Sequence, residues 1–199
     1  MKKTIPHILC IIGPSASGKT SIGDELEKYG YQHIVGHTTR KPRPGEIEGK
    51  TYYYVTLDEF NKIKENNEFV EYRPYSSHWV GTTKQEVLSK LKNTEALYSI
   101  VTFDGYLNLK KAFPNIPIDT LYINLDIETC IQRLKKRDAP IDEIQRRIEN
   151  YKNDDVYSYQ AKCDFVIDNS CEFNQTQLQI QKLINNLNKK YTFIQQSKD

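Results

Sequence analysis

Residues suited to binding phosphate stand together near the start of the chain, in the segment Gly13-Pro14-Ser15-Ala16-Ser17-Gly18-Lys19-Thr20. The segment fits the pattern G-x-x-x-x-G-K-[ST] and lies between an apolar run and an amphipathic helical pattern. Glycines let neighbouring backbone N–H groups point into one concavity, and the following helix adds the positive end of its dipole. Lys19 can reach terminal phosphates, and the Thr20 hydroxyl can ligate Mg²⁺. The segment predicts a nucleoside triphosphate site; the alternative is a glycine-rich turn without a ligand.

Two clusters of positive charge follow. Arg40, Lys41 and Arg43 stand within four residues, and interleaved prolines hold the backbone extended. Arginine offers fork-shaped donors to phosphate oxygens, so this stretch can clamp a phosphate; the alternative is a solvated basic loop. The second cluster surrounds a helix break and comprises Arg133, Lys135, Lys136, Arg137, Arg146 and Arg147. It can neutralise charge that develops during phosphoryl transfer, or it is an ordinary cationic helix end.

Composition limits the classes of protein to consider. The chain has 199 residues, 38% of them hydrophobic and 27% charged, as is typical of a globular domain. Its 28 Lys+Arg and 26 Asp+Glu give a net charge of +2, which does not favour nucleic-acid binding. The four cysteines lack metal-ligand spacing, which favours thiols in a reducing compartment. No stretch suits a membrane span or a secretory signal, so the expected location is the cytoplasm.

Strands are expected to alternate with helices over most of the chain. Apolar runs suited to buried parallel strands cover residues 8–12, 97–101, 118–123 and 165–167. Helical periodicity covers residues 19–29, 107–113, 127–136, 141–159 and 177–187. This order predicts an α/β fold with a parallel β-sheet flanked by helices.

The pattern changes between about residues 36 and 92. Tyrosines, prolines and short alternating stretches at 52–55, 69–75 and 79–82 predict an inserted subdomain with a small sheet of its own. Thr56 and Glu59 form a capping box before Phe60, which predicts one helix inside the insertion. The tail after Lys189 is polar and is expected to fray.

Taken in order, these motifs resemble guanylate kinase, a family of P-loop nucleoside monophosphate kinases, over about residues 5–190. Residues 38–52, TTRKPRPGEIEGKTY, resemble the family's GMP-phosphate segment, Asn67-Glu68-Phe69-Val70-Glu71 resembles its G-E-F-x-E, and Gly81-Thr82 resembles its Y-G-[ST]. The resemblance implies a single domain with a P-loop NTPase core (1–35 and 93–190). It also implies an inserted mixed α/β NMP-binding subdomain (36–92), a short lid at about 137–147, and a polar tail (191–199).

The resemblance also implies roles for individual residues. ATP and Mg²⁺ would be bound by Gly13, Ser15, Ala16, Ser17, Gly18, Lys19, Thr20 and Ser21, with Asn169 near the adenine. The acceptor would be bound through its phosphate by Arg40, Arg43, Glu46 and Tyr52, and through its guanine base by Glu71 and Thr82. The residues that stabilise direct in-line phosphoryl transfer would be Lys19, Arg133, Arg137 and Arg147. The expected partners are small-molecule nucleotides rather than nucleic acid or a membrane, with the chain as a monomer or homodimer.

The chain departs from the family pattern around the acceptor. The family usually has a serine where Gly36 stands, a tyrosine on the acceptor phosphate where Val80 stands, and an Asp-x-Asp that ends where Thr102 stands. Asp104 would face the same side as Thr102 if the strand continued; otherwise it is a turn residue before Gly105. The acceptor is therefore GMP or dGMP, another nucleoside monophosphate, or a sugar phosphate. A non-catalytic interaction module of the same fold is a further alternative.

Overall fold

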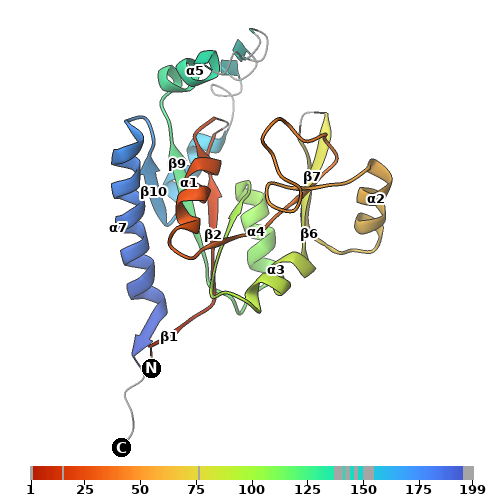
Figure 1. The fold of residues 1–199 in the computed structure, drawn as a ribbon, viewed down its shortest axis with the longest axis horizontal. Helices are drawn as coiled ribbons and strands as arrows, with labels where there is room; N and C mark the ends of the chain where they lie inside the picture. The colour runs from red at the N-terminus through yellow and green to blue at the C-terminus, as the bar shows by residue number, and fades with distance from the viewer. Residues whose placement is uncertain are drawn as a thin grey trace, which may run out of the picture.

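The central sheet contains five parallel strands in the order β10-β9-β2-β8-β3 (Figure 1). The strands are β2 (His7–Ile12), β3 (Gln32–His33), β8 (Ala96–Ile100), β9 (Ile118–Asn124) and β10 (Phe165–Asp168). The computed structural model describes residues 2–14, 16–75, 77–136, 141, 144–145, 148–149 and 155–194. Four of these strands lie within a residue or two of the apolar runs that predicted them, whereas the short β3 has no such run.

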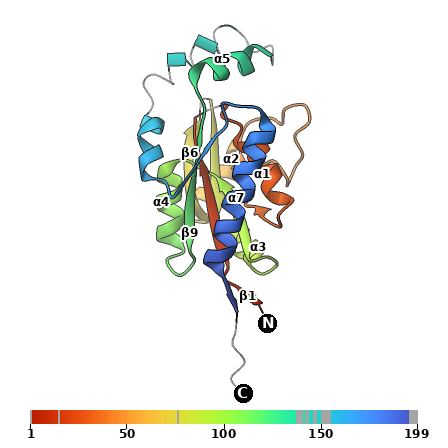
Figure 2. The same ribbon diagram turned by 90° about the vertical axis from the view of Figure 1, so that its left-hand side faces the viewer.

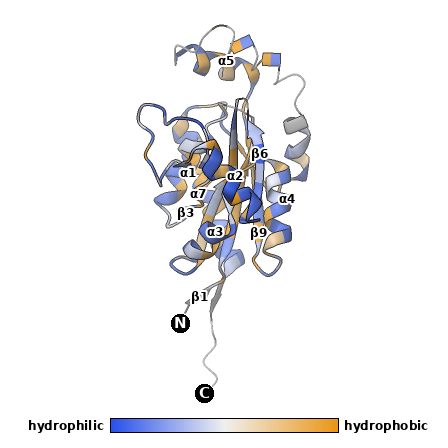
Figure 3. Cartoon of the chain, turned by 90° about the vertical axis from the view of Figure 1, so that its right-hand side faces the viewer, coloured by the Kyte–Doolittle hydropathy of each residue, from blue (hydrophilic) through white to orange (hydrophobic). Residues whose placement is uncertain are grey.

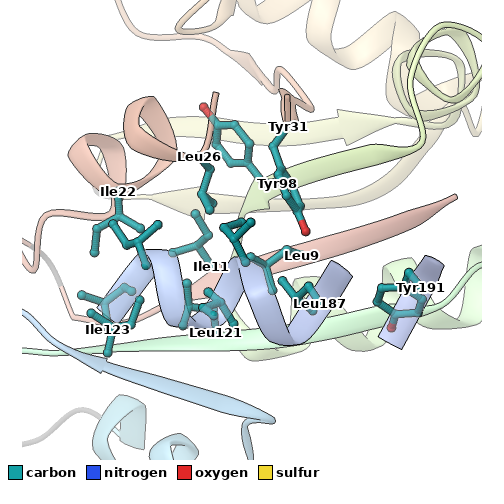
Figure 4. Close-up of a cluster of buried hydrophobic side chains, with 14 residues drawn as sticks. Leu9, Ile11, Ile22, Leu26, Tyr31, Tyr98, Leu121, Ile123, Leu187 and Tyr191 are labelled. Carbon is teal, nitrogen blue, oxygen red and sulfur yellow. The ribbon is translucent and has the colours of Figure 1, made fainter. Parts of the chain in front are cut away.

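Helices cover both faces of this sheet. They are α1 (Lys19–Glu27), α3 (Lys84–Leu91), α4 (Phe103–Ala112) and α7 (Phe173–Tyr191). Leu9 and Ile11 of β2 pack with α1 and α7 on one face (Figure 4), while Ile8 and Cys10 pack with α3 and α4 on the other. Side chains alternate along a strand, so one uninterrupted apolar run supplies both cores. The predicted α/β fold with a parallel sheet flanked by helices is confirmed.

A second sheet of four strands lies beside the central sheet, in the order β5-β4-β7-β6 (Figure 1). Its elements are β4 (His37–Thr38), β5 (Tyr53–Tyr54), β6 (Phe69–Tyr75), β7 (His78–Thr83) and the helix α2 (Leu57–Glu65). Phe60 anchors α2, because its ring centroid lies 4.5 Å from that of Phe69, and the rest of α2 is mostly hydrophilic (Figure 3). The capping box is confirmed, since Thr56 and Glu59 each accept a hydrogen bond from the other's backbone N–H.

Helix α5 (Ile127–Lys136) and the 3₁₀ helix η1 (Asp155–Lys162) follow β9. Helix α5 lies at the end of the central sheet opposite to the chain termini (Figures 1 and 2). The α-helix predicted for residues 141–159 differs from the structure at its end, where η1 forms a tighter turn. The ring of Tyr159 stacks on that of Phe103 in α4, with the two ring centroids 4.6 Å apart. This packing favours the tighter 3₁₀ conformation of residues 155–162. Most of the lid predicted at about 137–147 falls outside the described residues.

The C-terminal helix extends beyond its predicted end. Helix α7 reaches Tyr191, whose side chain is buried and whose hydroxyl donates to Asp119 at 2.6 Å. Strand β11 (Thr192–Ile194) then pairs antiparallel with β1 (Lys2–Thr4). The tail expected to fray after Lys189 is therefore helix and strand as far as residue 194, because these contacts hold it to the core. Within the described ranges, no helix has the length and apolar character needed to cross a membrane.

Candidate nucleotide-binding site

The predicted phosphate-binding loop connects β2 to α1. Its backbone φ is positive at Ala16 (62°) and Gly18 (88°), a geometry that gathers neighbouring N–H groups into an anion-binding concavity. Gly18 is also the N-cap residue of α1, and no side chain caps the helix there. The backbone N–H groups and the dipole at the start of such a helix favour a bound anion. Ser15 lies outside the described residues.

Lys19 and Ser17 add polar side chains to this loop. The ammonium of Lys19 donates to the carbonyl oxygens of Gly13 (2.8 Å) and Pro14 (2.7 Å), which holds it over the loop. The Ser17 hydroxyl is buried and has no hydrogen-bond partner among the described residues. Buried polar atoms without partners are rare in folded proteins, so a ligand that reaches this hydroxyl fits the loop.

Thr20 and Ser21 are exposed in the first turn of α1. A hydroxyl at the start of this helix is the kind of oxygen ligand that Mg²⁺ takes beside a nucleotide phosphate. With the backbone amides and Lys19 for the phosphates and Thr20 for the metal, the residues present fit a triphosphate with Mg²⁺.

Asn169 follows β10, which is parallel to β9 and β2, and supports the loop from the same end of the sheet. Its side chain is 2% exposed, its amide donates to the Ser17 carbonyl at 2.7 Å, and its amide oxygen accepts from Thr176 at 2.8 Å. A Cβ on Gly18 would collide with this amide, which explains the glycine. Sequence reasoning placed Asn169 near the donor's adenine; the structure shows a side chain bonded to the loop and to α7. The Thr176 contact was missed, because no local pattern pairs these residues.

Arg133 of α5 is hydrogen-bonded to Asn169 as well. Its guanidinium donates to the Asn169 carbonyl at 2.7 Å, which holds one predicted catalytic arginine beside the loop. Leu134 and Cys130 on the buried side of α5 form a small apolar cluster against which Ala16 packs. Arg137 and Arg147, the other two predicted catalytic arginines, lie outside the described residues, as does Arg146.

The basic loop of the second sheet folds around Glu46. The guanidinium of Arg40 donates two hydrogen bonds to this carboxylate, both at 2.6 Å. The Arg43 backbone N–H (2.7 Å) and the Tyr54 hydroxyl (2.8 Å) also donate to it. These donors, Arg40 foremost, lower the pKa of Glu46 to about 2, so the pair stays ionised in all but strong acid. Arg40 is thereby fixed over the ring of Tyr52, with 5.1 Å from its guanidinium carbon to the ring centroid.

Glu71 is a largely buried carboxylate on β6, an edge strand of the same sheet. It is 9% exposed, and one of its oxygens accepts a hydrogen bond from the Thr82 hydroxyl on β7 at 3.1 Å. Burial raises the pKa of Glu71, and the Thr82 bond and the positive charge of Arg73 oppose that shift. The other oxygen faces Gly105 in α4, where an added Cβ would lie 3.4 Å away. The pairing of β6 with β7 thus brings the two predicted base-reading residues together.

Comparisons with known proteins bear on both parts of this site, which are the loop between β2 and α1 and the second sheet. The family model described as guanylate kinase matches residues 6–187. This chain belongs to the guanylate kinase family. The guanylate kinase of Onion yellows phytoplasma is 32% identical over 170 residues, which cover 81% of this chain and 77% of that relative. The guanylate kinase of Rickettsia felis is 31% identical over 180 residues, covering 89% and 92%.

Solved structures agree on the fold. The crystal structure of guanylate kinase from Anaplasma phagocytophilum superposes with a TM-score of 0.69 and 19% sequence identity, and the match covers 96% of this chain and 89% of that one. At this identity the likeness concerns the architecture of the guanylate kinase fold rather than individual site residues.

Gly36 departs from the guanylate kinase pattern next to Tyr52. A Cβ built at Gly36 would lie 3.3 Å from the Gly81 carbonyl oxygen and 3.7 Å from the Tyr52 ring. A serine would fit with a small adjustment of these neighbours, so the glycine removes a hydroxyl without a steric need for it. At this position the second sheet therefore lacks a hydroxyl that the family pattern has.

The family's Asp-x-Asp pattern ends where Thr102 stands, and Asp104 is the nearest carboxylate, two residues farther along the chain. Thr102 does not continue β8; it is the N-cap of α4, and its hydroxyl accepts a hydrogen bond from the Gly105 N–H at 3.2 Å. Asp104 is exposed in the first turn of α4, where a carboxylate is favoured by the helix dipole. The continuing strand that would turn Asp104 toward the acceptor is absent, and Asp104 is helical rather than a turn residue. Its part in acceptor binding stays a prediction.

Proposed function

We propose that this chain transfers the γ-phosphoryl group of ATP to GMP or dGMP in a direct in-line reaction. Membership of the guanylate kinase family supports the reaction class, and the relatives named guanylate kinase support the acceptor. The observation that carries the acceptor choice is Glu71, a buried carboxylate held by Thr82 on the sheet that also carries Arg40 and Tyr52.

Glu71 suits guanine for a chemical reason. A carboxylate accepts hydrogen bonds from both N–H donors on the Watson–Crick edge of guanine, whereas adenine presents an unprotonated nitrogen at the matching position. Thr82 occupies one carboxylate oxygen and orients the group. A buried carboxylate left without its ligand is costly, so an acceptor that lacks these donors is rejected.

The donor loop positions the triphosphate through its amides, and Lys19 neutralises charge on the terminal phosphates. When Mg²⁺ is bound, it supplies charge neutralisation between these phosphates, with the Thr20 hydroxyl as its protein ligand. Arg133 stands beside the loop, where a cation stabilises charge that develops on the transferred group. Arg137 and Arg147 complete this set of proposed arginines. Catalysis then rests on positioning and electrostatics, with no covalent intermediate on the protein.

The proposed setting is the cytoplasm, where free nucleotides are the partners of the chain as a monomer or homodimer. No disulfide joins any of the cysteines Cys10, Cys130, Cys163 and Cys171, all of which lie in the described part of the chain, and this suits a reducing compartment.

The test is an acceptor panel with ATP and Mg²⁺, in which ADP release is coupled to a spectrophotometric readout. The panel contains GMP, dGMP, AMP, UMP, CMP, dTMP and a sugar phosphate. We expect kcat/KM with GMP and dGMP to be at least about 10³-fold higher than with the other acceptors, since the other acceptors leave polar groups of the site unpaired. Activity confined to another acceptor would reject guanine and keep the kinase, and ATP binding without any turnover would favour an interaction module.

A further inference from the structure

Val80 leaves a gap in the acceptor half. The family pattern has a tyrosine at this position, where its hydroxyl touches the acceptor phosphate, and valine has no polar atom to replace it. Trp79, the neighbour of Val80, packs against Phe60 of α2 with ring centroids 6.1 Å apart. Since side chains alternate along β7, Val80 belongs to the opposite face of the sheet, together with Thr82.

Arg73 lies directly across from Val80. The two residues are paired in the antiparallel ladder of β6 and β7, in which Glu71 is paired with Thr82. The register is regular from Glu71 onward, so Arg73 shares the face of Glu71. Tyr72 between them points to the opposite face, where its ring lies 6.5 Å from that of Phe60. Arg73 therefore lies on the same face as the proposed base-reading residues. On that face, its pair with Val80 is the next one after the pair of Glu71 with Thr82.

Other contacts place Arg73 toward the phosphate end of the acceptor half. Its guanidinium carbon lies 5.0 Å from the ring centroid of Tyr75. Burial is the main reason that the pKa of His78 is lowered, and the positive charges of Arg40, Arg43 and Arg73 each add to that effect. The positive charges of all three arginines are therefore felt at His78. Arg73 also lowers the raised pKa of Tyr52.

The charges of this cluster do not cancel. Arg40 is neutralised by Glu46, with which it forms a two-bond ion pair. Within the described part of the chain, neither Arg43 nor Arg73 forms an ion pair. A nucleoside monophosphate carries close to two negative charges on its phosphate near neutral pH, like a phosphorylated side chain. Two unneutralised arginines match that charge, and arginine donors fit phosphate oxygens.

We propose that Arg73 binds the phosphate of the acceptor and so replaces the tyrosine hydroxyl that the family pattern has at the position of Val80. The inference rests on the proposed function, because it takes the acceptor to be a nucleoside monophosphate whose base lies at Glu71. It adds a residue to the acceptor site that the motif pattern does not contain. The preference of this chain for phosphorylated acceptors then depends on Arg73 as well as on Arg40 and Arg43.

The decisive measurement compares the wild type with Arg73→Ala in steady-state kinetics with GMP. We expect the KM for GMP to rise about tenfold to a hundredfold, with kcat changed by less than about threefold, since a charge-assisted contact to the ground-state phosphate is lost. Arg73→Gln should behave in the same way and serves if the alanine variant folds poorly. Lys64→Ala is the matched control. Lys64 is also a cation over an aromatic ring of this sheet, 5.0 Å from the Tyr72 centroid, but on the α2 face. Its removal should leave the KM unchanged.

Two further measurements separate phosphate binding from a structural role. In calorimetry, Arg73→Ala should weaken binding of GMP and leave binding of guanosine unchanged. In kinetics, the double variant Arg73→Ala with Val80→Tyr should have a KM for GMP close to that of the wild type, because the tyrosine hydroxyl again contacts the phosphate. A KM within twofold of the wild type, or equal weakening of GMP and guanosine, would overturn the proposal.

Failure of the proposed function has a different signature. If the wild type phosphorylates another monophosphate instead of GMP, the assignment of guanine fails. The same KM comparison, made with that monophosphate, then decides the role of Arg73, since the contact is to phosphate and not to the base. A wild type that binds none of the monophosphates in the acceptor panel overturns both proposals.

Discussion

The donor half of this site, which is the loop between β2 and α1, and the acceptor half, which is the second sheet, present different kinds of chemical group to a ligand. In the donor half, most of the groups proposed to bind phosphate are backbone amides, positioned by the positive φ of Ala16 and Gly18 and by the hydrogen bond from the buried Asn169. In the acceptor half, the groups are side chains that project from a four-stranded sheet, such as Arg40 and Glu71.

The difference shows in what a substitution would meet. At Gly18 any side chain collides with Asn169, so the loop tolerates no other residue without rearrangement. At Gly36 a Cβ meets nothing closer than 3.3 Å, and Val80 lies within the strand β7. The donor motif is complete in this chain, while the acceptor half departs from the family pattern at Gly36, where a side chain needs only a small adjustment of its neighbours, and at Val80.

Removal of the Lys19 ammonium should have the largest effect and would break the donor half. Lys19→Ala is expected to lower kcat/KM on the order of 10³-fold or more, because the charge on the terminal phosphates is no longer neutralised. The fold should persist, since the Lys19 ammonium donates to the loop carbonyls of Gly13 and Pro14 and the residue belongs to none of the hydrophobic core clusters of the described residues. A coupled ADP-release assay measures the loss, and circular dichroism checks the fold. Turnover at the wild-type level would contradict the assignment of the loop.

A pH titration tests the acceptor half, with an intermediate effect. Burial raises the pKa of Glu71 above the usual 4.5, so this carboxyl takes up its proton at a higher pH than a solvent-exposed glutamate would. The protonated form accepts fewer hydrogen bonds from guanine, and the KM for GMP should rise about tenfold for each unit below that pKa. The pKa of Glu46 is about 2, so its pair with Arg40 does not contribute in this range.

The control for this titration is Glu71→Gln, which removes the titrating group and leaves the acceptor phosphate to titrate as before. Its KM for GMP should be high at every pH and should lack the additional rise in acid. If the wild type and the variant show parallel pH profiles, Glu71 does not read the acceptor.

The smallest effect is expected from the helix cap of the second sheet. Thr56→Ala removes the side-chain acceptor of the capping box and should lower the free energy of unfolding by about 1 kcal/mol. Urea denaturation measures this loss, and Thr56→Ser should retain most of the stability. The KM for ATP should not change, because α2 lies on the second sheet and the donor loop is held by the core. A matching rise in the KM for ATP would show that the two halves are coupled.

Local signals were sufficient for much of the fold. The apolar run at 8–12, the glycine-rich loop and the helix after it are adjacent in the chain, and so are Thr56 and Glu59. Strand propensity, backbone sterics and capping act over a few residues, which is why sequence reasoning located these elements. The same signals failed at the C-terminus, where Tyr191 is held by Asp119, a residue 72 positions earlier.

The sequence by itself determined the α/β class, the place of the phosphate-binding loop and the family, because each follows from residues that are neighbours in the chain. The tertiary structure decided how the side chains of the site are used. It joined Asn169 to Ser17 across 152 positions, and it set the strand register that places Arg73 opposite Val80. Such contacts depend on how helices and strands pack and on strand register, and a one-residue slip would turn Arg73 to the other face of the sheet. No local pattern contains that information.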